Sequence, residues 1–132
     1  MSNKLSQSQT RTELRHMANF EVGHLIDHPE IWLLMWKETL NAEEQSRLHS
    51  FLIGALRFRE FIWRQYQMGL LDKQTFDNYI LVVVQQLSSP RTRLWWDRYK
   101  TSGTFDQAFV NLVQELLENS PDFELQQHME SM

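Results

Sequence analysis

The sequence contains no cysteine among its 132 residues. This absence excludes disulfide bonds, zinc–thiolate sites and thiol catalysis, and it is consistent with a reducing compartment. No uninterrupted apolar run approaches the roughly 18 residues needed to cross a membrane, and the polar N-terminal stretch lacks the apolar segment of a secretory signal. We therefore expect a cytoplasmic protein that folds without covalent cross-links.

Glycine is also scarce, and the four glycines stand apart from one another. The sequence has no glycine-rich phosphate loop and no Gly-x-Ser-x-Gly elbow, so it offers no motif for nucleotide binding or for nucleophilic hydrolysis. We expect no bound cofactor. We also expect no enzymatic activity, apart from one weak metal-binding alternative that is considered below.

What the chain does have is a strong helical signal between residues 41 and 69. Asn41 is a suitable N-cap, Glu44 can complete a capping box, and Gly69 suits the left-handed residue that ends a helix. A chain with 42% hydrophobic residues can bury a sizeable core. We predict one long central helix over about residues 42–68, whose apolar face recurs at three- and four-residue steps: Leu48, Phe51, Leu52, Ala55, Leu56, Ile62, Trp63 and Tyr66.

Charged residues interrupt this apolar face. Glu60 and Arg64 are four residues apart in the order that favours pairing along a helix. Arg59 and Glu60 each share a stripe with apolar residues, so we expect one of the two to be half-buried. Two interpretations stay open, a structural charge pair that ties two helices together or the charged floor of a groove for a ligand or partner.

Shorter helical patterns flank the long helix on both sides. Together they predict an all-α protein, a single compact bundle of about six helices that occupies residues 9–119. The N-terminal residues 1–8 are expected to be disordered, and residues 120–132 to form a mobile acidic tail. The predicted flanking helices cover residues 9–26, 29–40, 72–87, 90–100 and 104–119, with Asp72, Ser89 and Thr104 as expected N-caps.

The segment from Leu40 to Leu116 resembles a recurrent bacterial all-helical domain of unknown function. The resemblance is carried by RFREFIWRQYQMGLLDKQTFDNY, SSPRTRLWWDRYK and FDQAFVNLV. Many relatives place transmembrane segments before this domain, which implies a membrane surface as an alternative location. The family implies no established reaction, and its signature positions correspond here to Glu60, Tyr66, Gly69, Asp72, Trp95 and Trp96.

A weak metal-site pattern lies near the end of the first predicted helix. Glu21, His24 and His28 have the three- and four-residue spacing that can place ligands on one side of a metal ion, which would support a metal-dependent enzyme. Pro29 directly follows His28 and disturbs the helix at that point. A di-iron bundle requires a Glu-x-x-His motif from each of two helices, and no other predicted helix contains one. The blander interpretation is a solvated helix end.

Residues 91–100 mix basic and aromatic side chains, a combination suited to phosphate contact and base stacking. The basic members are Arg91, Arg93, Arg98 and Lys100, interleaved with Trp95, Trp96 and Tyr99. The acidic residues beyond position 100 and the net charge of −4 disfavour a nucleic-acid partner. A nucleic acid or an anionic surface remains the alternative to a neutralised basic face with buried tryptophans.

Residues 31–36, between the first and the long helix, are apolar on all sides. Trp32 and Trp36 on one face can be buried in the core or can anchor an interface. Because a surface helix buries only part of its circumference, we predict a homodimer through this segment. The function that these features favour is a non-enzymatic sensory or interaction module with a protein partner.

Overall fold

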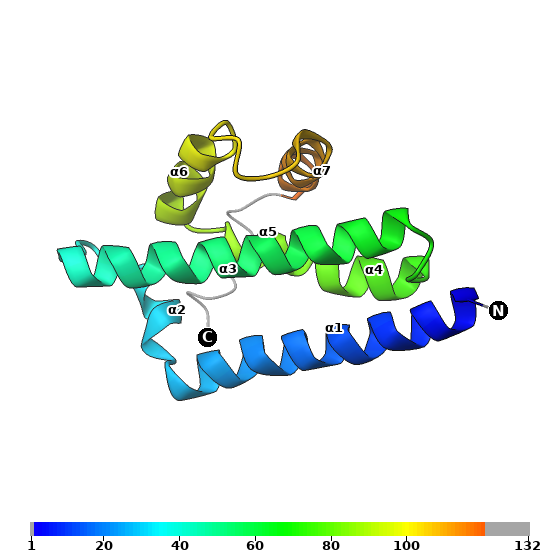
Figure 1. The fold of residues 1–132 in the computed structure, drawn as a ribbon. Helices are drawn as coiled ribbons and strands as arrows, with labels where there is room; N and C mark the ends of the chain where they lie inside the picture. The colour runs from blue at the N-terminus through cyan, green and yellow to red at the C-terminus, as the bar shows by residue number, and fades with distance from the viewer. Residues whose placement is uncertain (1, 121–132) are drawn as a thin grey trace. The chain divides into compact units, whose positions relative to one another are not determined.

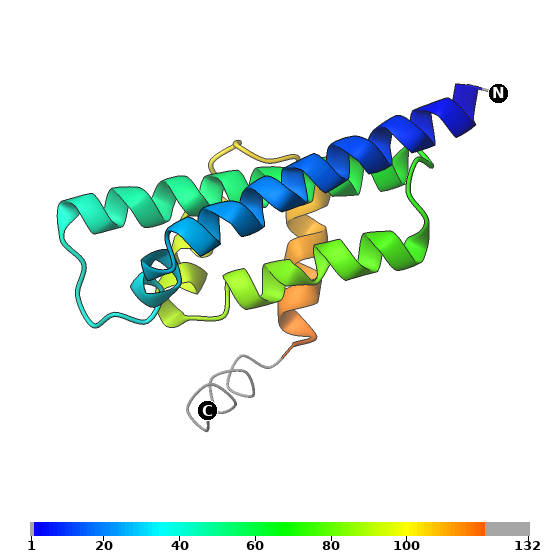
Figure 2. The same ribbon diagram turned by 90° about the horizontal axis from the view of Figure 1, so that it is seen from below.

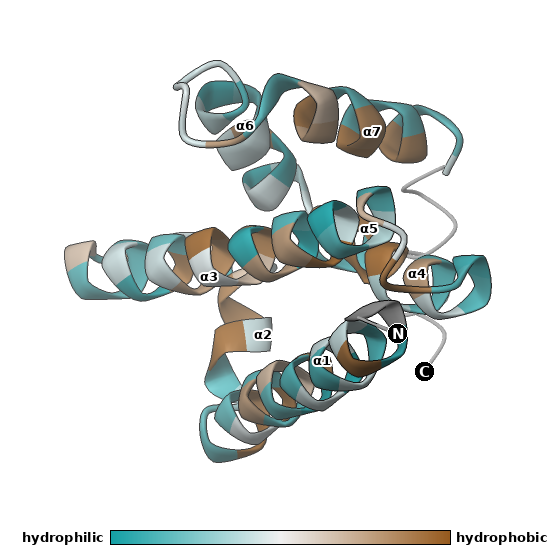
Figure 3. Cartoon of the chain, turned by 45° about the vertical axis from the view of Figure 1, so that its right-hand side comes forward, coloured by the Kyte–Doolittle hydropathy of each residue, from teal (hydrophilic) through white to brown (hydrophobic). Residues whose placement is uncertain are grey.

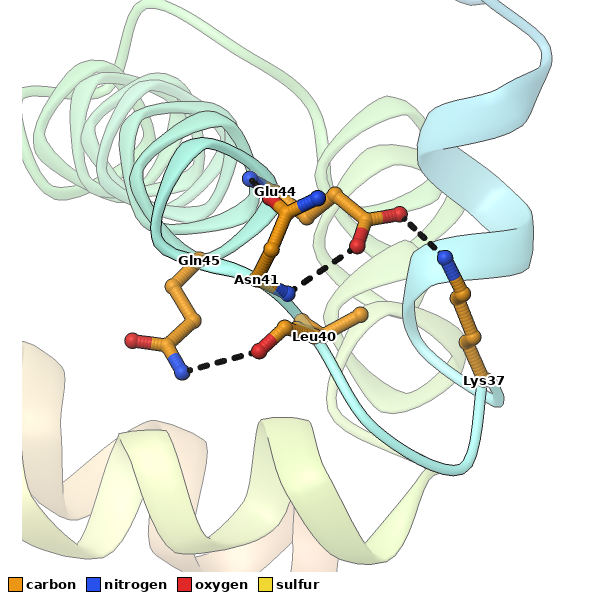
Figure 4. Close-up of polar contacts among 5 residues, drawn as sticks. All are labelled: Lys37, Leu40, Asn41, Glu44 and Gln45. Carbon is orange, nitrogen blue, oxygen red and sulfur yellow. Dashed lines mark hydrogen bonds and ion pairs between the residues drawn. The ribbon is translucent and has the colours of Figure 1, made fainter.

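The predicted long helix is present as α3 (Ala42–Gln67) in the computed structural model, which describes residues 2–120. Its N-terminus carries the expected capping box (Figure 4): the Asn41 side chain accepts a hydrogen bond from the Glu44 amide, and the Glu44 carboxylate accepts one from the Asn41 amide. Lys37 Nζ lies 2.6 Å from the second Glu44 oxygen. Gly69 follows the helix with φ of +75°. The sequence prediction for this helix is therefore confirmed.

The inward face of α3 is rotated slightly from the predicted one. Phe51, Trp63 and Tyr66 are only half-buried, whereas Phe58 is buried. Arg59 and Glu60 are both buried, so the prediction that one of them would be half-buried was wrong. Glu60 lies within 4.0 Å of Arg57 and 3.9 Å of Arg64. The residues of α3 that are buried are Leu48, Leu52, Ala55, Leu56, Phe58, Arg59, Glu60 and Ile62.

The first helix, α1, spans Ser2–Asp27 and runs antiparallel to α3 (Figures 1 and 2). The expectation that residues 1–8 are disordered is wrong from Ser2 onward. Contacts with the far end of α3 accompany this early start: Gln7 Nε2 donates to the Gly69 carbonyl at 3.3 Å, and Thr10 Oγ1 donates to Gln65 Oε1 at 3.0 Å. Pairing partners so distant in sequence leave no local signal that a sequence pattern can detect.

A short helix, α2 (Glu30–Leu34), joins α1 to α3 in place of the predicted helix over residues 29–40. Backbone hydrogen bonds of the tighter i→i+3 spacing occur at both of its ends, among them Ile31 to His28 and Trp36 to Leu33. Beyond them the chain extends to the Asn41 cap. Ile31, Leu34 and Met35 are buried.

The helix predicted over residues 72–87 is divided into α4 (Lys73–Ile80) and α5 (Val82–Gln86). Asp72 caps α4 as predicted, accepting from the Thr75 amide at 2.7 Å. The break at Leu81 precedes the three consecutive valines, whose branched side chains lower helix propensity. With this break, residues 2–120 contain seven helices where about six were predicted.

The same break divides the chain into two compact units, Met1–Ile80 and Leu81–Met132, within the range predicted as one domain. In the first unit α3 packs against α1, α2 and α4. Tyr66 of α3 stacks on Phe76 of α4 with ring centroids 4.2 Å apart, and Phe58 meets Tyr79 edge-on at 6.4 Å. No strand occurs among the described residues, so the protein is all-α.

The second unit contains α5, α6 (Pro90–Tyr99) and α7 (Gln107–Glu118). Ser89 caps α6 and Pro90 occupies its first turn, as predicted. Asp106, not Thr104, caps α7, because its carboxylate accepts from the Ala108 amide at 2.9 Å. Figure 3 shows hydrophobic and hydrophilic residues alternating around α7. Its buried residues are Phe109, Val110, Val113 and Leu117.

None of the helices within residues 2–120 has the length and apolar character to span a bilayer. The predicted mobile tail, apart from Ser120, lies outside the described residues.

Candidate functional site

The first unit contains a cavity of about 830 Å³ between α1 and α3, which we call the α1–α3 groove. Ile31 of α2 and His28 line it at the end where α1 finishes. Carbon atoms form most of its surface, and several lining residues are exposed to solvent along its length. The lining residues are His16, Met17, Phe20, Glu21, His24, His28 and Ile31 on one side, and Glu43, Ser46, Arg47, Ser50, Phe51, Gly54, Ala55 and Phe58 on the other.

The wall formed by α3 has small side chains at its centre. Ser46, Ser50 and Gly54 recur at four-residue steps, so they lie one above another on a single face of the helix. All three are exposed. A Cβ atom built on Gly54 would meet no other atom within 4 Å, which shows that the space above it is open.

The wall from α1 is aromatic. His16, Phe20 and His24 also recur at four-residue steps and therefore share one face of α1. Phe20 is 77% exposed although it is a large apolar side chain. The His24 ring stacks on Phe51 across the groove, with centroids 6.5 Å apart. This ring pair has one member on each wall of the groove.

A buried ion pair lies beside this groove. Arg59 Nη2 donates to Glu21 Oε1 at 2.7 Å, and the Arg59 side chain is only 2% exposed. Its guanidinium carbon lies 4.8 Å from the centre of the Phe58 ring. The other two donor atoms, Nε and Nη1, have no hydrogen-bond partner among the described residues. The pair joins α3 to α1, as the first of the two interpretations offered by the sequence expects, and of its two members Glu21 lines the groove.

A second ionic cluster lies at the end of the groove where α1 finishes. Glu30 Oε1 accepts a hydrogen bond from Arg47 Nη2, and His28 Nδ1 lies 3.2 Å from the same oxygen. The Glu30 backbone amide and then the Arg47 side chain lower the pKa of Glu30 from 4.5 to about 2. These contacts connect the start of α2 to α3.

The lowered pKa of Glu30 predicts a loss of stability in acid. The folded protein stabilises the ionised form of this carboxylate more than the unfolded chain does. Its contribution to the free energy of unfolding is therefore complete above about pH 4.5 and is lost as the pH falls toward about 2. We expect the urea midpoint of the wild type to fall more steeply between these limits than that of Glu30→Gln, measured by tryptophan fluorescence. Parallel pH profiles for the two proteins would contradict this assignment.

The residues of the weak metal pattern do not form a ligand set. Within residues 2–120 no group of three or more His, Asp or Glu side chains is placed to hold a metal ion. Glu21 is bonded to Arg59, and the His24 and His28 rings lie 5.0 Å apart at a tilt of 47°. All three line the α1–α3 groove, so their helical spacing places them on the groove surface and not around a metal ion.

The predicted interface residues of the second helix are half-buried. Trp32 and Trp36 are both half-buried, and Trp36 Nε1 is buried without a hydrogen-bond partner among residues 2–120. Leu33, between them, is 66% exposed. Homodimerisation through this segment stays a prediction, and the exposed member available to it is Leu33.

The basic and aromatic segment of α6 is partly engaged in the second unit. Trp96 is buried, and its Nε1 donates to Gln114 Oε1 at 2.6 Å. Arg93 Nε donates to the Leu87 carbonyl at 3.2 Å, and Lys100 pairs with Asp97 at 3.1 Å. Arg91 is half-buried, whereas Arg98 is exposed. Binding of an anionic partner here stays a prediction.

Comparison with protein-family models, with curated proteins and with solved structures gave no match. The resemblance to a bacterial helical domain therefore stays a prediction. Its signature residues have structural roles in this chain. Tyr66 stacks on Phe76, Gly69 and Asp72 form the turn between α3 and α4, and Trp95 stacks on Tyr99 at 5.0 Å.

No pattern in the sequence predicted the groove as a whole. A signal was present in the repeated small residues of α3 and in the exposed position of Phe20, but small and polar residues at four-residue steps are also typical of an ordinary solvent-facing helix surface. The hollow depends on the distance between α1 and α3, which no local pattern specifies.

Proposed function

We propose that residues 1–80 act as a non-enzymatic interaction module whose α1–α3 groove receives an apolar element of a partner. The observation that carries this proposal is a cavity of about 830 Å³ with largely apolar walls and an exposed phenylalanine, Phe20, at its edge. Binding sites commonly enclose about 300–1,000 Å³ and combine apolar walls with a few fixed polar groups. Glu21, held by Arg59, is such a group.

Two glycines of this unit allow a matched test. Gly54 lies in the groove and Gly23 lies on α1 outside the lining set, and neither would place a Cβ within 4 Å of another atom. Replacing either one by phenylalanine is therefore compatible with the fold and replaces the poorest helix former after proline. Gly54→Phe would place a large ring in the groove, whereas Gly23→Phe would not.

We expect the dye anilinonaphthalene sulfonate to bind the wild type in the groove, because this dye reports accessible apolar surface. Its dissociation constant, measured by fluorescence titration, should rise about 10-fold or more in Gly54→Phe, a change of about 1.4 kcal/mol, and should stay the same in Gly23→Phe. Circular dichroism would establish that both variants are folded. Identical dye binding by all three folded proteins would overturn the proposal.

A further inference from the structure

We infer that the occupant of the α1–α3 groove is a basic amphipathic helix of three to four turns from another protein. This inference rests on the proposed function and specifies the chemistry of the partner. It follows from the length, the shape and the charges of the groove.

The length of the groove suits an extended element. Its α3 wall runs from Glu43 to Phe58, which at 1.5 Å per residue is about 22 Å, and its α1 wall from His16 to His28 is about 18 Å long. Small-molecule sites bury about 70–90% of their ligand, but here Phe20, Ser46 and Ser50 are exposed along the trough. A helix of about 14 residues would span the same distance and leave its outer face in water.

The shape of the groove suits the face of a helix. The small side chains at positions 46, 50 and 54 allow a partner backbone to approach α3 closely, and Phe20 and Phe51 supply aromatic surface in the same lining. A helix recognised in a groove presents apolar residues at i, i+3, i+4 and i+7. Such a stripe would fill the space that is open above Gly54.

The charges of the groove favour a basic partner. The two cationic residues at the groove are already neutralised, since Arg47 is bonded to Glu30 and Arg59 to Glu21. Glu43 is exposed in the lining and has no ionic partner among the described residues, and Glu21 has a second oxygen, Oε2, to which no hydrogen bond is made.

These two carboxylates are separated along the groove. Glu43 is in the first turn of α3, whereas Glu21 contacts Arg59, which lies 16 positions further along α3 and about 24 Å away. Lysine or arginine near both ends of the partner helix would complement them, and the net charge of −4 on the chain acts in the same direction.

Fluorescence anisotropy with three labelled 14-residue peptides tests this inference. The first has a leucine stripe with lysines on its flanks, the second replaces each lysine by glutamate, and the third scrambles the first at constant composition. We expect the leucine–lysine peptide to bind at least about 10-fold more tightly than either of the others, a difference of about 1.4 kcal/mol. Gly54→Phe should abolish this preference for the first peptide, and Gly23→Phe should preserve it.

A pair of charge variants locates the electrostatic contribution. Glu43→Gln removes the carboxylate in the groove, and Glu13→Gln removes an exposed carboxylate of α1 that lies outside the lining set. Both change the net charge equally. We expect Glu43→Gln to weaken the leucine–lysine peptide several-fold and to reduce its dependence on salt, while Glu13→Gln leaves binding unchanged.

The outcomes separate this inference from the proposed function. Equal binding of the lysine and glutamate peptides would overturn the basic character of the partner, and equal binding of the scrambled peptide would show attraction by charge alone. If no peptide binds while Gly54→Phe still weakens the dye, the groove remains a binding site and the helical partner is wrong. Dimerisation that Gly54→Phe abolishes, measured by sedimentation, would replace the foreign helix by a second copy of this chain.

Discussion

Trp96→Ala is expected to reduce the free energy of unfolding of the second unit by about 3–5 kcal/mol. Trp96 is the largest fully buried side chain among residues 2–120. Its ring lies 6.1 Å from that of Phe105, and its Nε1 donates to Gln114 Oε1. The substitution therefore leaves a cavity and also removes a buried hydrogen bond. A loss of this size is comparable with the whole stability of a small domain.

Urea denaturation followed by circular dichroism would measure this change. Leu94→Ala, two residues away on the same helix, is the matched control because Leu94 is 52% exposed. We expect that control to change the stability by less than about 0.5 kcal/mol. A loss below about 1 kcal/mol for Trp96→Ala would contradict the placement of this ring in the core.

The second large effect concerns the buried ion pair beside the groove. Glu21→Leu would leave the Arg59 guanidinium buried with none of its donors paired, and removing one partner of a buried pair costs about 3–5 kcal/mol. Arg59→Met should cost less, about 1–2 kcal/mol, because the remaining Glu21 carboxylate is 17% exposed and can bind water.

The double variant Glu21→Leu, Arg59→Met provides the decisive comparison. With no charge left to desolvate, it should be more stable than Glu21→Leu alone, which amounts to a coupling energy of about 1–3 kcal/mol between the two positions. Thermal and urea unfolding of the four proteins would complete the cycle. Strictly additive losses would show that the pair contributes through packing alone.

Helices with local end signals could be predicted from the sequence, often to within a residue. Asn41 and Glu44 begin α3, Gly69 follows its end, and Ser89 with Pro90 begins α6. In each case the side chain that satisfies the free backbone group lies within a few residues of it, so the signal is contained in a short window of sequence.

Helix lengths that depend on distant contacts were predicted less well. In the N-terminal turns of α1, Gln7 and Thr10 bond to residues more than 50 positions away. The second helix was predicted too long because its apolar residues suited a helix, whereas the chain must extend to reach the start of α3.

The same distinction applies to the candidate site. Charged residues within the apolar face of α3 left two possibilities, a pair that ties two helices or a charged floor, and Arg59 forms a pair with α1. Its partner, Glu21, was assigned to a weak metal pattern because a sequence shows spacing along one helix but not pairing between two. The groove itself depends on the separation of α1 and α3, which only tertiary packing determines.

The shallow attachment of α1 has a consequence for the affinity of any partner. Of the α1 side chains whose burial is described, only Thr10 and Leu14 are buried, although the helix has 26 residues. Few buried contacts mean a low free energy for local opening. Since α1 supplies one wall of the groove, only molecules with α1 docked are competent to bind, and the apparent dissociation constant equals the intrinsic one divided by that competent fraction. A partner that binds the groove therefore also draws the population of α1 toward its docked state.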